Sequence, residues 1–406
     1  MKKQKKYSIF VLMNINDFIS ARINKLREEM MQSGINLAIL AKPEHYFYFS
    51  NFNPIINSHP AFVIIPLTGE PCLLVHCLRA SHAKKEAALR NIQLYGKWGD
   101  VSSIALDSID ALNEVISGCN LKHIKVGLEL SFVNHNLYNK IVDRTNIDEI
   151  TDITDIVDEL KMVKDDYEIS LLKKSADIAD YGMEVIIDYL RNGYSEAMAS
   201  TEAQYAMRKR WQEKCPEYEI TGFGSAESGV HDSLSSWCLS GERISYGCDC
   251  SSNHIPQKGE LVLPFVWAKI GGYFVENERS LYVSEISSFK MKVFKTVLDA
   301  REKVFTAIKP GVTCEYLYTE AKKVFDTNGF SNNLPGRIGH GIGLSAHEHP
   351  SLQMGNKLKL AEGMVFTVEP GLISVNWGGV RPSDTIVVTK NGYESLTKTK
   401  NGILKI

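Results

Sequence analysis

The chain has 406 residues, a length that favours two domains over one. Hydrophobic residues make up 44% of it and charged residues 23%, as in an ordinary globular protein. The net charge is −2 and no long run has a single sign, which argues against nucleic-acid and anionic-membrane partners.

The first 16 residues are expected to form a disordered tail. A basic cluster at residues 2–6 precedes an apolar run that is too short for a signal peptide. Elsewhere no window approaches the ~20 apolar residues of a membrane span. The eight cysteines lack paired CxxC spacing, which favours reduced thiols and a cytoplasmic protein.

Residues 17–156 alternate helical and strand patterns, which predicts a small α/β domain. A helix pattern at 21–33 ends at Gly34 and is followed by a short apolar run typical of a buried strand. The predicted strands of this domain are 36–40, 61–65, 72–75 and 124–127.

Residues 157–406 predict a second, α+β domain, introduced by a long amphipathic helix. Apolar residues at 156, 160, 163, 167, 171 and 172 follow helical spacing. This helix would link the two domains. Thr313 is a plausible N-cap of a later helix that ends at Asn328. The other predicted helices are 195–214 and 289–308, and antiparallel hairpin strands are expected at 260–269, 273–283, 364–369 and 380–389.

A set of short motifs in the second half of the chain resembles the creatinase and aminopeptidase P superfamily. The motifs are Gly-Glu-Leu-Val at 259–262, Gly-His-Gly-Ile-Gly-Leu at 339–344, His-Glu at 347–348, Val-Glu-Pro-Gly at 368–371 and Gly-Val-Arg at 379–381. The resemblance implies a creatinase-type N-terminal domain followed by a pita-bread domain, a curved antiparallel sheet flanked by helices.

The resemblance also implies a metal site that this chain has only in part. Metal-dependent members bind two divalent ions through two Asp, one His and two Glu. Here His340 and Glu369 match, Glu276 takes the second Asp position, and Phe265 and Ser383 replace two further ligands. Three ligands could still hold one zinc ion, but the expectation is that the protein has no metal and no cofactor.

The absence of these ligands favours a resemblance to creatinase, which needs no metal. Creatinase is similar to this chain in having a Glu-Arg pair on the same strand. Glu276 and Glu278 are two residues apart, so on a strand they face the same side. Together with Glu369 they could grip a planar cationic substrate in place of the metal. The alternative is that Glu276 or Glu278 simply pairs with Arg279 or Arg381.

Cys248 stands where the family places a catalytic His, and three roles stay open for it: nucleophile, proton shuttle or buried packing residue. The resemblance gives His347 a substrate-polarising role, and it implies that residues such as His59 in the first domain close the site of the other subunit in a homodimer. The predicted catalytic residues are Cys248, Glu278, His340, His347 and Glu369, and the predicted substrate-binding residues are Phe265, Phe274, Glu276, Arg381, Ser383 and His59.

Three functions follow from these observations. The leading hypothesis is a metal-independent, creatinase-like hydrolase that cleaves a guanidino, amidino or cyclic amidine C–N bond in a small cationic metabolite. The second is a mononuclear metal-dependent Xaa-Pro aminopeptidase or related lyase that uses Glu276, His340 and Glu369. The third is a non-catalytic pita-bread protein that binds a peptide or partner.

Overall fold

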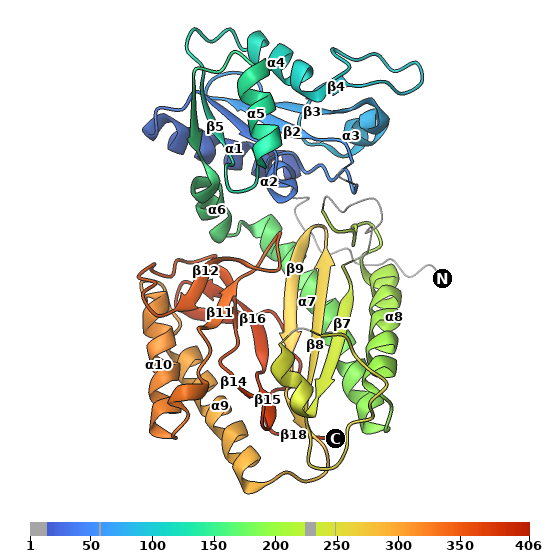
Figure 1. The fold of residues 1–406 in the computed structure, drawn as a ribbon, viewed down its shortest axis with the longest axis vertical. Coiled ribbons are helices and arrows are strands. Elements are labelled where there is room, and N and C mark those ends of the chain that lie inside the picture. Colours follow the sequence, from blue (N-terminus) through green and yellow to red (C-terminus); the bar gives the residue numbers. More distant parts are fainter. Residues whose placement is uncertain (1–13, 57, 224–232, 248) are drawn as a thin grey trace, which may run out of the picture. The chain divides into compact units, whose positions relative to one another are not determined.

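The computed structural model describes residues 14–56, 58–223, 233–247 and 249–406 (Figure 1). The chain divides into two compact units. Among the described residues, the first unit comprises residues 14–160 with Phe223, and the second comprises residues 161–222 and 233–406, without residue 248.

The first unit is built on a six-stranded sheet in the order β4-β3-β2-β1-β5-β6. β1 pairs antiparallel with β2 and parallel with β5, so the sheet is mixed. Apolar side chains of α4 and α5 pack on it to form the core. The strands are β1 (Leu37–Leu40), β2 (Phe62–Pro66), β3 (Cys72–His76), β4 (Asn91–Tyr95), β5 (Lys125–Leu128) and β6 (Glu149–Asp152); the helices are α1 (Ile15–Gln32), α2 (Pro43–Ser50), α3 (Ala80–Glu86), α4 (Ser108–Gly118), α5 (His135–Arg144) and α6 (Thr154–Met162).

The second unit is built on a larger sheet in the order β12-β11-β13-β16-β9-β8-β10-β18, with β7 beside β8 and β17 beside β16. β14 and β15 form a separate antiparallel pair. The strands are β7 (Ser235–Ser240), β8 (Leu261–Ile270), β9 (Tyr273–Glu278), β10 (Leu281–Tyr282), β11 (Arg337–Gly341), β12 (Glu348–Gln353), β13 (Val365–Val368), β14 (Leu372–Ser374), β15 (Gly378–Val380), β16 (Ser383–Thr389), β17 (Gly392–Ser395) and β18 (Leu404–Lys405).

The described helices that cover this second sheet, α7 to α10, form two pairs (Figure 1). α7 and α8 pack against β7, β8 and β9, while α9 and α10 pack together beside the half of the sheet that contains β11, β12 and β13. This arrangement leaves the strands β8, β9, β11, β13 and β16 free to present side chains on their other face. The helices are α7 (Asp166–Arg191), α8 (Glu196–Lys214), α9 (Ser288–Ala307) and α10 (Cys314–Thr327).

The helix ends show where local sequence decides the structure. The Thr313 hydroxyl accepts a hydrogen bond from the Tyr316 amide at 3.2 Å, which confirms the predicted N-cap. The prediction of one continuous helix through residues 156–172 is wrong. Asp165 and Glu168 form a capping box, each side chain accepting from the other's amide at 2.9 Å, and this starts α7 as a new helix.

A buried charge cluster fixes the segment between α6 and α7 to β12. The carboxylate of Glu348 lies 3.0 Å from Lys164 Nζ and 3.7 Å from Lys161 Nζ, and all three side chains are buried. Burial alone would raise the pKa of Glu348, but the two lysines lower it to about 2. The stabilisation from this cluster is therefore complete above the ordinary Glu pKa and is lost as the pH falls toward 2.

Replacing Glu348 by Gln is expected to lower the free energy of unfolding by about 3 kcal/mol at neutral pH, because two buried lysines lose their counter-ion. Urea denaturation at a series of pH values measures this. The gap between the variant and the unmodified protein should narrow as the pH falls below 4.5. Glu394→Gln, in an exposed pair with Lys173, is the control and should stay within about 0.5 kcal/mol; a pH-independent gap for Glu348→Gln would contradict the assignment.

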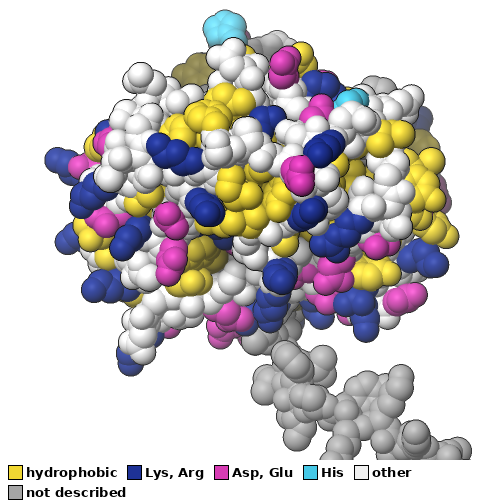
Figure 2. All heavy atoms as spheres, turned by 90° about the horizontal axis from the view of Figure 1, so that it is seen from below, with side chains coloured by type: hydrophobic (Ala, Val, Ile, Leu, Met, Phe, Trp, Pro, Cys, Tyr) yellow, Lys and Arg dark blue, Asp and Glu magenta, His cyan; other side chains and the backbone are white. Residues whose placement is uncertain are grey.

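On the face drawn in Figure 2, acidic and basic side chains are interspersed with apolar ones. The described part of that face has no continuous area of one sign, in keeping with the small net charge. Within the part of the chain that the structure describes, no helix has the length and apolar character that a membrane span requires.

Candidate functional site

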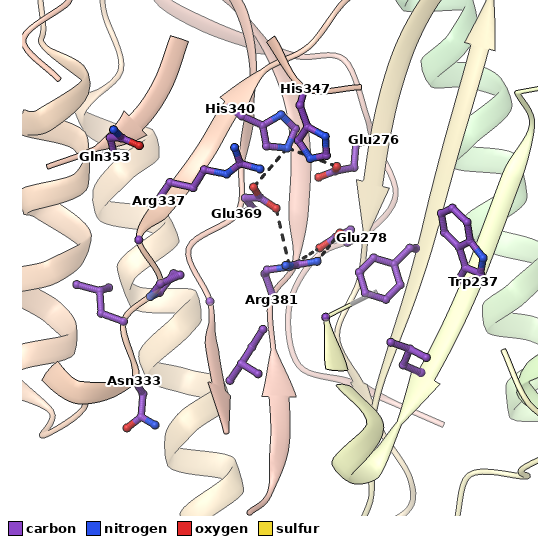
Figure 3. Close-up of a pocket in the computed structure, with 18 of the residues that line it drawn as sticks. Trp237, Glu276, Glu278, Asn333, Arg337, His340, His347, Gln353, Glu369 and Arg381 are labelled. Carbon is purple, nitrogen blue, oxygen red and sulfur yellow. Dashed lines mark hydrogen bonds and ion pairs between the residues drawn. The ribbon is translucent and has the colours of Figure 1, made fainter. Parts of the chain in front are cut away.

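Two neighbouring strands supply one wall of the site. The register of the β8–β9 hairpin places Phe265 opposite Glu278 and Trp267 opposite Glu276. Because side chains two residues apart on a strand share a face, Glu276 and Glu278 both line the same cavity (Figure 3). The sequence prediction that these two carboxylates lie together is confirmed by their position.

Two glycines place His340 in this cavity. A Cβ atom at Gly339 would lie 2.0 Å from the Thr367 carbonyl oxygen, and one at Gly341 would lie 2.0 Å from the His349 carbonyl oxygen. Only glycine therefore lets β11 approach both neighbouring strands. The ring of His340 donates from Nδ1 to the Gly341 carbonyl at 3.0 Å, which directs Nε2 at the acidic groups.

Glu276, His340 and Glu369 bring three potential ligand atoms within 4.8 Å of one another, and all three residues are buried. His340 Nε2 lies 3.6 Å from Glu276 Oε2 and 3.5 Å from Glu369 Oε1 (Figure 3). Two ligands of one zinc-like ion, with bonds of about 2.0–2.1 Å at tetrahedral angles, would be about 3.4 Å apart. The separations thus match ligands around one shared ion.

Two neighbours hold the Glu276 carboxylate in place. Trp267 Nε1 donates to Oε2 at 3.0 Å, and the Ser383 hydroxyl donates to Oε1 at 2.6 Å. Hydrogen bonds of this kind orient metal ligands in proteins. The resemblance places a metal ligand at the position of Ser383. Here Ser383 instead holds the potential ligand Glu276 in its orientation.

Arg381 binds the third carboxylate. Its Nε and Nη2 atoms donate to Glu278 at 3.0 and 2.9 Å, and Nε lies 3.8 Å from Glu369 Oε2. The guanidinium carbon is 5.4 Å from the centroid of the Phe265 ring. Of the two possibilities left by the sequence, the structure has Glu278 paired with Arg381, so the organic cation is supplied by the chain itself.

The charges of the cavity favour a further cation. The pKa of Glu369 is raised, first by burial and then by the negative charge of Glu276. Burial also opposes ionisation of Glu276, but His340, Ser383 and Arg381 lower its pKa to about 2. With Glu278 neutralised by Arg381, two carboxylates remain, and a single divalent ion would balance them.

The donor set fits one metal ion and does not fit two. Three protein ligands with a remaining open position are the usual composition of a catalytic zinc site. A second ion would need ligands at Phe265, which has no lone pair, and at Ser383, whose hydroxyl is bonded to Glu276. Arg381 already binds the Glu278 carboxylate beside that position.

The cavity has a volume of about 750 Å³. Trp237, Phe265 and Trp267 form an aromatic wall, and the two indole rings meet edge to face with centroids 4.9 Å apart. His347 also lines the cavity, with its ring centroid 4.3 Å from that of His340. Burial and the charge of His340 lower the pKa of His347, which favours a neutral imidazole.

Some predicted site residues lie elsewhere. Phe274 does not line the cavity; it lies near the turn of the hairpin with Lys269 Nζ 4.6 Å from its ring centroid. His59 belongs to the first unit and stacks on His76 at 4.0 Å, so its role in a second subunit's site stays a prediction. Cys248 lies outside the described residues.

Sequence reasoning missed Arg337 and Trp237. Arg337 is three residues from His340, a spacing that predicts opposite faces on a regular strand. The β11–β12 pairing shifts register between these two residues, and both line the cavity. Trp237 pairs with Phe265 across β7 and β8, but nothing in its own segment of sequence marked it as part of the site.

Comparison with known proteins identifies the family. The model of metallopeptidase family M24 matches residues 170–390, more than half of the chain. The chain belongs to metallopeptidase family M24. The model of the creatinase/prolidase N-terminal domain matches residues 22–163. The prediction of the creatinase and aminopeptidase P superfamily, and of its two-domain fold, is confirmed.

Individual M24 relatives cover nearly the whole chain. The Xaa-Pro dipeptidase of Pyrococcus furiosus is 27% identical over 94% of this chain and 99% of its own length. The Xaa-Pro dipeptidase of Lactobacillus delbrueckii subsp. lactis is 25% identical over 93% and 96%. Among solved structures, the Xaa-Pro dipeptidase from Bacillus anthracis has a TM-score of 0.81 at 25% identity and covers 96% of this chain and 100% of its own.

These relatives overturn the leading hypothesis of a metal-independent, creatinase-like hydrolase. They are Xaa-Pro dipeptidases, whose substrates contain peptide bonds, so the prediction of an amidinohydrolase acting on other C–N bonds is wrong. The physical argument for a cationic substrate also fails, because Arg381 already neutralises the charge of Glu278. The M24 relatives support the second hypothesis, a metal-dependent Xaa-Pro peptidase.

Proposed function

We propose that this protein is a metal-dependent dipeptidase for Xaa-Pro dipeptides that works with one divalent ion, held by Glu276, His340 and Glu369. The observation that carries the proposal is the buried triad, with its donor atoms within 4.8 Å of one another. The similarity to Xaa-Pro dipeptidases over nearly the whole chain supplies the substrate class.

When bound, the ion would polarise the scissile carbonyl and lower the pKa of a bound water. The chain's own residues would orient the reactants. Glu276 would be kept in its ligand position by Trp267 and Ser383. His347, with its ring against His340, is placed to donate a hydrogen bond to the carbonyl oxygen of the scissile bond.

Metal removal tests the proposal. Protein stripped by a chelator should not cleave Leu-Pro, and titration with Mn²⁺, Co²⁺, Zn²⁺ or Fe²⁺ should restore cleavage at one equivalent per chain. Leu-Ala serves as the comparison substrate and should be cleaved more slowly. Undiminished activity in chelator, a requirement for two equivalents, or no cleavage with any of the four metals would each contradict the proposal; the last outcome would favour a non-catalytic binding protein.

We further propose that the protein is a homodimer in which the first unit of one subunit closes the site of the other. The superfamily resemblance supports this, and the cavity of the second unit has residues exposed at its rim, among them Asn332 and Gly336. Light scattering should give twice the chain mass. A monomer with full dipeptidase activity would contradict it.

A further inference from the structure

The guanidinium of Arg381 has hydrogen-bond donors that the fold does not use. Its Nε and Nη2 atoms bind the carboxylate of Glu278, at 3.0 and 2.9 Å. Its Nη1 atom donates to no residue that the structure describes. The Arg381 side chain lines the cavity and is 25% exposed. One edge of this guanidinium is therefore open to a ligand in the cavity.

Several contacts fix the orientation of Arg381. Glu278, which binds the guanidinium on one side, is itself buried. The guanidinium carbon lies over the Phe265 ring, 5.4 Å from its centroid. The Arg381 backbone amide donates to the Ser280 hydroxyl at 2.9 Å. Because these contacts hold the open donors in place before a substrate binds, the donors need no reorganisation during a reaction.

Arg381 also lies beside the proposed metal ligands. One oxygen of Glu369, Oε1, is 3.5 Å from His340 Nε2, and the other, Oε2, is 3.8 Å from Arg381 Nε (Figure 3). The Glu369 carboxylate thus lies between two places for positive charge, the triad and the guanidinium. An arginine remains charged at any pH at which the protein works. A site with one divalent ion therefore has a second, permanent cation next to it.

Hydrolysis of a peptide bond creates a negative charge on the scissile carbonyl oxygen. The oxygen of a water molecule forms a bond to the carbonyl carbon, the π-electron pair of the C=O bond moves onto the carbonyl oxygen, and one proton of the water passes to the Glu369 carboxylate. When the electron pair returns, the C–N bond breaks and the departing proline nitrogen takes the proton. Fixed donors aimed at the charged oxygen lower the barrier to this reaction.

We propose that Arg381 stabilises this charged oxygen through the open edge of its guanidinium, and so supplies the second positive charge of a site that holds one metal ion. This inference rests on the proposed dipeptidase function. It also gives a role to Phe265 and Glu278: the two side chains leave no ligands for a second ion and instead hold the guanidinium that replaces it.

A tetrahedral analogue of the substrate tests this role. A phosphinate in place of the scissile amide of Leu-Pro retains both ends of the dipeptide and has a negative charge where the carbonyl oxygen becomes charged. Calorimetry on metal-loaded protein measures phosphinate binding, and steady-state kinetics with Leu-Pro separates KM from kcat. Arg381→Gln should weaken phosphinate binding and lower kcat by about 100- to 1000-fold each, while KM changes by less than about threefold.

Two further variants separate this role from a structural one. Arg381→Gln leaves the buried Glu278 without a counter-ion, which can destabilise the fold. The double variant Glu278→Gln/Arg381→Gln removes both charges and should show the same two losses while it retains one metal ion per chain. Arg381→Lys retains a counter-ion for Glu278 without the fork of the guanidinium, and should recover part of both losses.

Arg210→Gln is the matched control. Arg210 binds Asp177 through the same two nitrogens, Nε and Nη2, at 3.0 and 2.7 Å, and its guanidinium lies over the Tyr181 ring. Its side chain is 27% exposed, close to the value for Arg381, but it does not line the cavity. This variant should leave phosphinate binding, kcat and KM unchanged.

The possible outcomes distinguish this role from the proposed function. Unchanged phosphinate binding in Arg381→Gln, a loss that lies in KM and not in kcat, or loss of the metal ion from the double variant would overturn the role of Arg381. No phosphinate binding to the unmodified protein would overturn it as well. Phosphinate binding that depends on Arg381, without hydrolysis of Leu-Pro at any metal loading, would support the role while overturning the proposed function. Hydrolysis of Leu-Pro with the same kcat in all Arg381 variants would do the reverse.

Discussion

Glu276→Gln is expected to abolish metal binding and to lower Leu-Pro hydrolysis by about a thousandfold, because a bound ion supplies several kcal/mol of transition-state stabilisation. The amide of Gln is a poorer ligand than a carboxylate. It must also turn its NH₂ group toward either Trp267 or Ser383, both of which donate hydrogen bonds to this side chain. Metal content after dialysis and kcat/KM measure the two effects.

Ser383→Ala provides the matched comparison for this prediction. It removes one hydrogen bond to Glu276 but no ligand, so metal affinity should fall by about 10- to 100-fold and saturating metal should recover most of the activity. Thermal unfolding in chelator should be similar for Glu276→Gln and the unmodified protein, since the variant removes one of three neighbouring buried carboxylates. Full metal content in Glu276→Gln would exclude it as a ligand.

Asp384→Asn is expected to cause the largest loss of stability, about 3–5 kcal/mol in the free energy of unfolding. Asp384 is buried and forms ion pairs with Arg279, at 2.7 Å, and with Arg301. It also accepts hydrogen bonds from Thr397 and Asn401, both at 2.7 Å. Burial would raise the pKa of Asp384, but the two guanidiniums lower it, so the Asp384 carboxyl is ionised in the folded protein. Urea denaturation at neutral pH measures the loss.

Asp177→Asn is the matched control for Asp384→Asn. Asp177 accepts two hydrogen bonds from Arg210, at 3.0 and 2.7 Å, but Asp177 is exposed and Arg210 is only partly buried. Its loss should cost less than about 1 kcal/mol because water replaces the lost partner. Similar losses for the two variants would show that burial does not set the strength of the Asp384 network.

Periodic patterns and caps in the sequence predicted most elements of the fold. The spacing of Glu276 and Glu278 predicted that both face one cavity, and the motifs around His340 and Glu369 predicted that these residues join them. The first prediction succeeds because two-residue alternation on a strand is a local property, whereas the second came from the superfamily resemblance of the motifs.

The partners of these residues could not be predicted in the same way. Glu278 meets Arg381 because β9 pairs with β16 in a register that sets Glu278 opposite Ser383, and that register depends on the whole sheet. Arg337 reaches the cavity through an irregularity in the β11–β12 pairing. The sequence hypothesis therefore assigned Glu278 to a substrate cation, when a cation from a distant part of the chain already binds it.

The Glu278–Arg381 pair has a consequence for the protein without metal. An arginine cannot be removed by a chelator or by a change of pH in the physiological range, so one of the three buried acidic side chains retains its counter-ion under all such conditions. Chelation should then inactivate the enzyme without unfolding it, and re-addition of metal should restore activity with a simple hyperbolic dependence on concentration.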